Sequence, residues 1–301
     1  MNFMTAVRDL QLSGRHVCVG LDSDWDKLPE HLKKGVGQSR AEVIFGFNRA
    51  IVDATKDQVC AFKPNGAFCS THYGDDQALV NTVSYIHVTA PGIPVIGDLK
   101  RADIGNTNKQ YVAEAFEKFK VDAVTVNPYF GQEGLQPFLD QTDKGIIVLC
   151  RTSNKGAAEF QDLPVYIAAP DDAADLNLGP EDATVPLFLY VAMRVAKHWN
   201  KNNNCALVVG ATAPGELAKV RSLVGDMQLL IPGVGKQGGP LAEVVAAGVD
   251  RTGSGMIINS SRDVIFASSG EDFAAAAGRE AKKLNDAIKV CLAGNISRGI
   301  R

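Results

Sequence analysis

The chain has 301 residues, of which 46% are hydrophobic and 22% are charged, and its formal net charge is −3. This is the composition of an ordinary globular protein, and because no basic tract stands out we expect no nucleic-acid partner. No apolar run approaches the roughly 20 residues of a membrane-spanning helix, so we expect no membrane partner, and the first 16 residues do not form a secretory signal.

Short β-branched runs alternate with longer helical patterns along the chain. Strands are predicted at residues 16–22, 59–65, 93–100, 123–129, 145–153, 205–212, 229–235 and 255–262. A short amphipathic helix precedes them, and further helices are predicted at 40–56, 76–90, 105–119, 132–141, 184–200, 214–224, 239–247 and 271–293.

Eight strand-then-helix units in a chain of this length favour parallel strands closed into a (β/α)8 TIM barrel, one domain over residues 1–301. An open doubly wound sheet is the alternative. Such a sheet usually carries a glycine fingerprint after its first strand, whereas the first strand here ends in GLDSDW.

The connection after the fifth strand, residues 154–185, is too long for an ordinary loop and has no strong periodicity. Loops of this length are usually functional lids or disordered. We expect it to close over the site, with Gly156 as a hinge.

The six cysteines include no C-x-x-C pair, and four of them lie within apolar runs, where a free cysteine behaves as a small hydrophobic residue. Reduced thiols in a cytoplasmic protein are the favoured interpretation, and a metal cluster is the weaker alternative.

Charged residues leave the third predicted strand in the run GDLKRADIGNT. Asp98 and Lys100 are two residues apart, so on a strand they share a face, and Asp103 follows in the turn. Lys63 ends the preceding strand. The reactive groups of such barrels collect at the carboxyl ends of the strands, so we expect the four alternating charges to meet there. Solvated strand ends are the alternative for any single residue.

The spacing has a chemical meaning for Lys100. A buried lysine tends to lose its proton, and two flanking carboxylates oppose this loss and hold an ammonium. A cation fixed between two anions contributes little to stability, but it can deliver a proton to a carbanion. The pattern therefore predicts a proton-donor site at a carbon centre.

The run DLKRADIGNT resembles the Asp-x-Lys-x-x-Asp-Ile signature of the orotidine 5′-phosphate decarboxylase family. GLDSDW, FKPN and RTSN on the first, second and fifth strands are also similar to that family. PGVGKQGG and NSSR on the seventh and eighth strands resemble its bacterial branch called type 2. The resemblance implies cofactor-free decarboxylation of orotidine 5′-phosphate to UMP and CO2 in pyrimidine biosynthesis, by a homodimer with shared active sites.

The resemblance also implies a role for each matching residue. Lys100 would protonate C6 of the pyrimidine, Asp98 would lie beside the departing carboxylate and orient Lys100, and Asp103 would come from the partner subunit. Lys63 would bridge to Asp98 as part of the catalytic network and would also bind the ribose with Asp22. The remaining substrate contacts would be Thr107 reaching the ribose with Asp103, Ser153 with Asn154 at the pyrimidine, and Gln237 with Arg262 at the phosphate.

Three readings of the function stay open at this stage, and the decarboxylase that the resemblance implies is the first. Sister decarboxylases and aldolases share the Asp-x-Lys-x-x-Asp motif, but they bind Mg²⁺ through an acidic residue where this chain has Lys63, so we expect no metal. A non-catalytic barrel that binds a nucleotide phosphate is the third reading. Thr125 and Asn127 on the fourth strand point one way and could line the site, although we favour barrel filling for them.

Overall fold

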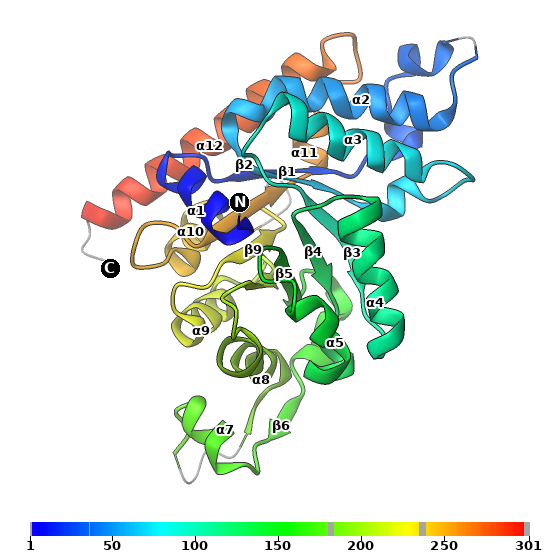
Figure 1. Ribbon diagram of the computed structural model, residues 1–301. Coiled ribbons are helices and arrows are strands. Elements are labelled where there is room, and N and C mark those ends of the chain that lie inside the picture. Colours follow the sequence, from blue (N-terminus) through cyan, green and yellow to red (C-terminus); the bar gives the residue numbers. More distant parts are fainter. Residues whose placement is uncertain (1, 36, 180–183, 235–238, 298–301) are drawn as a thin grey trace.

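The computed structural model describes residues 2–35, 37–179, 184–234 and 239–297. Eight parallel strands form its central sheet (Figure 1): β1 Val17–Leu21, β2 Val59–Pro64, β3 Ile96–Arg101, β4 Ala123–Val126, β5 Gly145–Arg151, β8 Cys205–Val209, β9 Leu229–Pro232 and β10 Met256–Ser260.

The sheet closes on itself. Its strands follow the order β2-β1-β10-β9-β8-β5-β4-β3, and parallel bridges from Phe62 to Val95 and from Asn65 to Asp98 join β2 to β3. The predicted (β/α)8 barrel is therefore confirmed, and the open doubly wound alternative is wrong.

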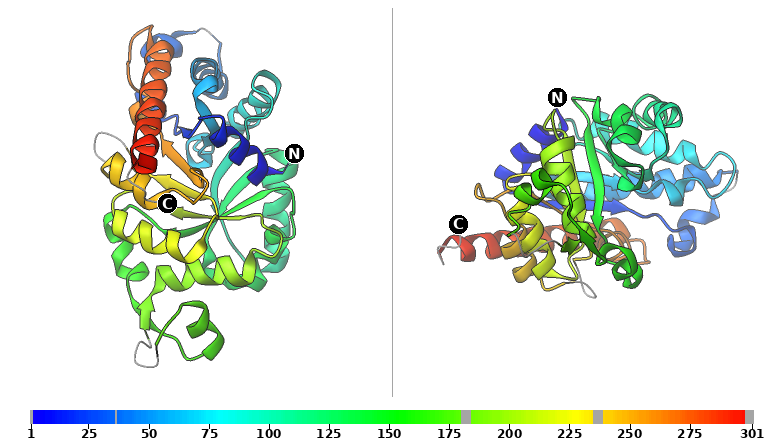
Figure 2. Two further views of the ribbon diagram at one scale, coloured as in Figure 1. Left: turned by 90° about the vertical axis from the view of Figure 1, so that its left-hand side faces the viewer. Right: turned by 90° about the horizontal axis from the view of Figure 1, so that it is seen from below.

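Helices follow the strands and surround the barrel, as the view nearly along its axis shows (Figure 2). The helices around the strands are α2 Arg40–Thr55, α3 Asp76–Thr89, α4 Gly105–Ala113, α5 Gly131–Leu139, α8 Leu187–Met193, α9 Pro214–Val224, α10 Leu241–Gly248, α11 Arg262–Ile265 and α12 Phe273–Ser297. Within the described ranges, no helix is long and apolar enough to cross a membrane.

Helix α1, Phe3–Leu12, closes the amino-terminal end of the barrel. Phe3 and Val7 are buried among the inward-facing residues of the strands, including Ile147 and Ile257. Because side chains fill this end, ligand binding is left to the opposite end, where the carboxyl termini of the strands lie.

A larger apolar core lies between the strands and the outer helices, and α2 illustrates how the sequence builds it. Ser39 and Glu42 form a capping box that starts the helix. Phe47 then stacks between Phe266 and Phe273, with ring centroids 5.7 and 5.3 Å away. This core joins residues from both ends of the chain, while the domain boundaries 1–301 stay a prediction.

The segment after β5 carries elements of its own instead of one irregular loop. They are α6 Ala158–Gln161, β6 Pro164–Tyr166, α7 Pro170–Asp175 and β7 Thr184–Pro186. Strand β7 occupies the first residues of the predicted helix 184–200, which consequently begins at Leu187.

This segment is fastened to α8 in the structure. Strands β6 and β7 form an antiparallel hairpin, and the hairpin and α7 project away from the barrel (Figure 1). The buried Asp172 carboxylate accepts hydrogen bonds from the Tyr190 hydroxyl at 3.1 Å and from Arg194 at 2.9 Å. The hairpin and α7 therefore do not lie over the barrel in this structure, and closure of 154–185 over the site stays a prediction.

Candidate active site

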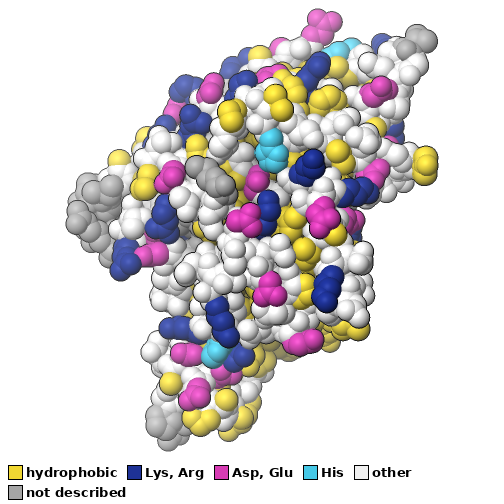
Figure 3. Space-filling view, in the orientation of Figure 1, with side chains coloured by type: hydrophobic (Ala, Val, Ile, Leu, Met, Phe, Trp, Pro, Cys, Tyr) yellow, Lys and Arg dark blue, Asp and Glu magenta, His cyan; other side chains and the backbone are white. Residues whose placement is uncertain are grey.

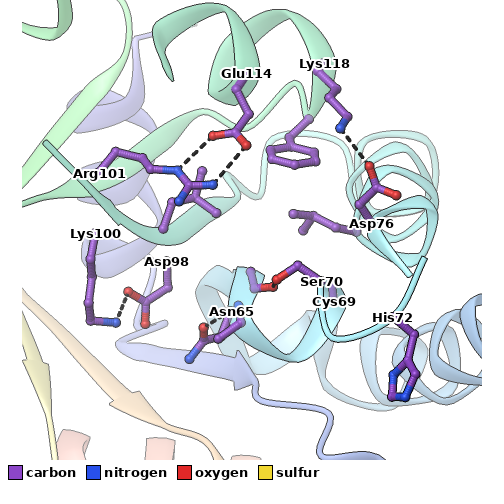
Figure 4. A pocket seen from close by; sticks show the side chains of 15 residues that line it. Asn65, Cys69, Ser70, His72, Asp76, Asp98, Lys100, Arg101, Glu114 and Lys118 are labelled. Atoms are coloured by element: carbon purple, nitrogen blue, oxygen red, sulfur yellow. Dashed lines mark hydrogen bonds and ion pairs between the residues drawn. The ribbon is translucent and has the colours of Figure 1, made fainter. Parts of the chain in front are cut away.

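Three of the predicted side chains meet at the carboxyl-terminal ends of β2 and β3. The Lys63 ammonium donates to Asp98 Oδ2 at 2.7 Å, and the Lys100 ammonium donates to Asp98 Oδ1 at 2.6 Å. Figure 4 shows the Lys100 amine beside Asp98, whereas Arg101, the next residue, contacts Glu114. Asp98 and Lys100 thus lie together, as predicted, although Lys100 lies where the regular pairing of β3 is interrupted.

The burial of the two lysines differs from our expectation. The Lys63 side chain is 6% exposed and that of Asp98 is 10% exposed, whereas that of Lys100 is 51% exposed. Lys100 also has a positive φ of 49°, a region that residues other than glycine seldom adopt. The expectation of a buried Lys100 is wrong, because the chain turns outward there; the buried lysine is Lys63.

The charges of this cluster keep one another ionised. Burial by itself would raise the pKa of Asp98, but the ammonium groups of Lys63 and Lys100 outweigh burial and hold this pKa well below its ordinary range. Burial would likewise lower the pKa of Lys63, and the carboxylates of Asp98 and Asp22 outweigh it, so the pKa of Lys63 is raised. An ionised Asp98 can therefore hold the Lys100 ammonium in place.

Thr125 belongs to the cluster as well. Its side chain is buried on β4, and its hydroxyl accepts the Lys100 backbone N–H at 3.0 Å and donates to Asp98 Oδ1 at 2.9 Å. Barrel filling was the wrong interpretation for this residue. The sequence feature that could have identified Thr125 is its position on the strand next to β3, on the same face as Asn127. Asn127 caps the turn that follows β4.

Asp103 and Thr107 do not contact this cluster within the described chain. Asp103 follows β3, and its carboxylate accepts the N–H of Ile104. Its carbonyl oxygen accepts from the buried Asn108 side chain at 2.6 Å. Thr107 lies exposed in the first turn of α4. Of the four alternating charges expected to meet, three do so in one chain, because Asp103 lies beyond the end of the strand.

Asp22 lies one residue beyond β1, close enough to Lys63 to affect its pKa. Its Oδ1 atom is buried and has no hydrogen-bond partner in the described part of the chain, and the same holds for Oδ1 of Asn259 on β10. Sequence reasoning missed Asn259, although it alternates with the inward-facing Ile257. Buried acceptors without donors suit the hydroxyl groups of a bound ligand.

Ser153 and Asn154 lie just past the end of β5. Ser153 packs closely against Gly210, where an added Cβ would come 2.9 Å from the Ser153 Cβ, and its hydroxyl lies near Gly233. Asn154 accepts a hydrogen bond from the Thr152 hydroxyl at 2.6 Å. Both residues are exposed, at the start of the segment that leads to the hairpin.

Arg262 is exposed and begins α11, directly after β10. Gln237 lies outside the described residues. At the end of the glycine-rich run, Gly239 approaches the Ala211 carbonyl so closely that any side chain would overlap it. This glycine is therefore required for packing between two loops at the mouth of the barrel.

A cavity of about 490 Å³ adjoins the cluster beside β3, and Asp98 and Lys100 form part of its wall (Figure 4). The other cations at its wall are already paired, Arg101 with Glu114 and Lys118 with Asp76 at 2.8 and 2.7 Å. Among the described residues, no group of three or more His, Cys, Asp or Glu side chains could hold a metal ion.

The family profile described as "Orotidine 5'-phosphate decarboxylase / HUMPS family" matches residues 15–277. The chain belongs to this family. It is 48% identical over 289 residues to orotidine 5′-phosphate decarboxylase of Azoarcus sp., covering 96% of this chain and 98% of the relative. It is 45% identical over 294 residues to the enzyme of the same name from Cellvibrio japonicus, covering 97% and 100% of the two chains.

A solved structure is also similar, that of Leishmania donovani OMP decarboxylase. Its TM-score is 0.76 at 31% identity, over 96% of this chain and 99% of that one. The chain belongs to this family and is 45–48% identical to two of its enzymes over nearly its whole length. These findings confirm the predicted activity, the decarboxylation of orotidine 5′-phosphate to UMP in pyrimidine biosynthesis. The sister activities and the non-catalytic barrel are thereby disfavoured, and placement in the type 2 branch stays a prediction.

Proposed function

We propose that Lys100 protonates C6 of the substrate and that Asp98 and Lys63 hold it for this task. The observation that carries the proposal is the double ion pair. The Lys63 ammonium donates to Asp98 Oδ2, and the Lys100 ammonium donates to Asp98 Oδ1 at 2.6 Å. The Lys100 ammonium therefore has a fixed anchor, while half of its side chain stays accessible to a ligand.

The reaction needs this anchored charge. When the bond between C6 and the carboxylate breaks, CO2 leaves and the electron pair stays on C6, in the ring plane, where the π system does not delocalise it. An ammonium oriented in advance stabilises that developing anion. C6 then takes a proton from Lys100 Nζ, and the neutral amine regains a proton from solvent.

The ionised Asp98 adds a second effect. A substrate carboxylate bound next to it meets a like charge, and this repulsion ends when CO2 leaves. Such destabilisation of the bound substrate has to be offset by binding elsewhere in the ligand. We assign this binding to Asp22 and Lys63 at the ribose hydroxyls, supported by the buried Asp22 Oδ1, which has no hydrogen-bond partner among the residues that the structure describes.

The remaining contacts follow from position at the mouth. Arg262 is assigned to the phosphate, since an exposed guanidinium at the start of α11 can form paired hydrogen bonds with phosphate oxygens. Gln237 is assigned to the phosphate with it on the family resemblance alone, because it lies outside the described residues. Ser153 and Asn154 are assigned to the pyrimidine edge, supported by their place where the 154–185 segment leaves β5.

We further propose a homodimer in which Asp103 and Thr107 complete the partner's site. Large apolar side chains are exposed next to Asp103: Ile104 is 62% exposed and Phe130 is 47% exposed. Gly134 lies between Phe130 and the Asp103 carbonyl oxygen, so these residues form one surface. Exposed apolar groups rimmed by charge are typical of protein interfaces.

Mixing inactive variants tests the shared site. Lys100→Ala and Asp103→Ala each remove a different half of a site, so mixed dimers contain one intact site. Random exchange should restore about a quarter of the wild-type activity, because half of the dimers are hybrids with one of two sites intact. Lys100→Ala mixed with Asp98→Ala is the matched control, which should stay inactive. A Lys100→Ala and Asp103→Ala mixture that stays inactive would contradict a shared site.

A cytoplasmic location is also proposed. All six cysteines are free, and five of them are buried. Burial raises the pKa of Cys18, Cys69, Cys150 and Cys205 to about 12, which is characteristic of inert structural thiols. On the face in Figure 3, basic and acidic side chains are intermixed, in keeping with the expectation of no nucleic-acid partner.

A further inference from the structure

The regular pairing of β3 with β4 is interrupted where the catalytic cluster begins. Gly97 of β3 pairs with Val124, and the next paired residue of β3 is Arg101, opposite Val126. Three residues of β3 therefore lie opposite the single residue Thr125. Such a bulge bends a strand and redirects its side chains, and here it carries Asp98 and Lys100.

Within the bulge a side chain accepts the backbone N–H of Lys100. The acceptor is the Thr125 hydroxyl, at 3.0 Å. Lys100 has a φ of 49°. Positive φ costs energy in a residue with a side chain and persists only where neighbours impose it.

The same hydroxyl also orients the carboxylate. Thr125 donates to Asp98 Oδ1 at 2.9 Å, the oxygen that also accepts from the Lys100 ammonium. A hydroxyl has one donor and two acceptor sites, so both bonds can exist together. Thr125 is 1% exposed, so little water can replace either bond.

We infer that Thr125 is a positioning residue for the proton transfer. Its hydroxyl fixes the backbone from which the Lys100 side chain departs and the carboxylate oxygen on which the ammonium rests. It acts through Lys100 and Asp98, and the inference rests on the roles proposed for them. These two contacts fix the direction of the long, half-exposed Lys100 side chain. Small misplacements of reacting groups lower the reaction rate strongly.

Thr125→Val tests the hydroxyl with little change in side-chain volume. We expect kcat for orotidine 5′-phosphate to fall by about ten- to a hundredfold, with a much smaller change in KM, because both bonds of the Thr125 hydroxyl go to Lys100 and Asp98. Thr125→Ser keeps the hydroxyl and should recover most of the lost kcat. Thr55→Val is the matched control: Thr55 is equally buried and donates to the Ile51 carbonyl at 2.7 Å, at the end of α2 that leads into the amino-terminal end of β2, so its kcat should stay at the wild-type value.

The outcomes separate this inference from the proposed function. Wild-type kcat in Thr125→Val, or an equal loss in Thr125→Ser, would overturn the positioning role. Full turnover by Lys100→Ala would instead overturn the role proposed for Lys100. If Thr125→Val does not fold, Thr125→Ala is compared with Thr125→Ser instead. Equal kcat values in these two variants would contradict a role of the hydroxyl.

Discussion

Replacing Lys63 by methionine tests the buried half of the cluster. Methionine keeps most of the apolar stem and removes the ammonium 2.7 Å from Asp98 Oδ2. Taking away one member of a buried pair typically costs about 3–5 kcal/mol, because it leaves a buried charge without its partner. Asp98 retains the Lys100 and Thr125 bonds at Oδ1, so we expect the lower end, about 3 kcal/mol.

Denaturant unfolding at pH 7 measures this loss. Lys118→Met is the matched control, since Lys118 forms an ion pair of the same 2.7 Å length with Asp76, but with side chains 52% and 41% exposed. Exposed pairs contribute about 0–1 kcal/mol. Adding Asp98→Asn to Lys63→Met should recover part of the loss, because the orphaned charge is then gone. If Lys63→Met costs no more than Lys118→Met, the buried pair does not hold the cluster together.

The sign of the pH dependence offers a second check. The pKa of Asp98 is lowered on folding, so its pairing stabilises the protein above the unfolded pKa of about 4 and is lost as the pH falls below it. The difference in stability between the wild type and Lys63→Met should therefore narrow as the solution is made acidic.

Three further predictions concern the phosphate, a buried histidine and metals. Arg262→Ala should raise KM by a larger factor than it lowers kcat in steady-state assays, since it removes a contact remote from the chemistry; unchanged constants would refute the phosphate assignment. Burial, with a smaller effect of Lys289, lowers the pKa of His16 from 6.5 to about 4. Folding therefore favours the neutral imidazole, and the protein should lose about 3 kcal/mol of stability as the pH falls from 6.5 toward 4. Unfolding free energies of His16→Gln should show a flatter slope over that range, and an unaltered slope would contradict this. Activity should survive excess EDTA, because Lys63 stands where a metal-binding relative would carry an acidic ligand; loss of activity, restored by Mg²⁺, would count against it.

The sequence was sufficient for the barrel and for the Lys63–Asp98–Lys100 cluster. Strand alternation places Asp98 on the inner face with Ile96, and the closing bridges between β2 and β3 bring Lys63 beside it. Both consequences follow from the periodicity of a strand and the order of strands in a parallel barrel. Lys100 meets Asp98 as predicted, although it lies in the bulge, where the regular alternation is interrupted.

Other features depend on tertiary register and were missed. The bulge opposite Thr125 arises from the pairing of β3 with β4, which no local pattern determines, so the exposure of Lys100 and the role of Thr125 were not foreseen. The 154–185 segment is held to α8 through Asp172 and Tyr190, a contact that composition does not reveal.

Exchange of the C6 proton of the product tests the role of Lys100 most directly. If Lys100 delivers the proton to C6, it must also remove it in the reverse step, so UMP incubated with the wild-type protein in D2O should slowly exchange its C6 proton for deuterium, as followed by ¹H NMR. We predict that Lys100→Ala binds UMP without catalysing this exchange. Undiminished exchange by Lys100→Ala would show that another group protonates C6.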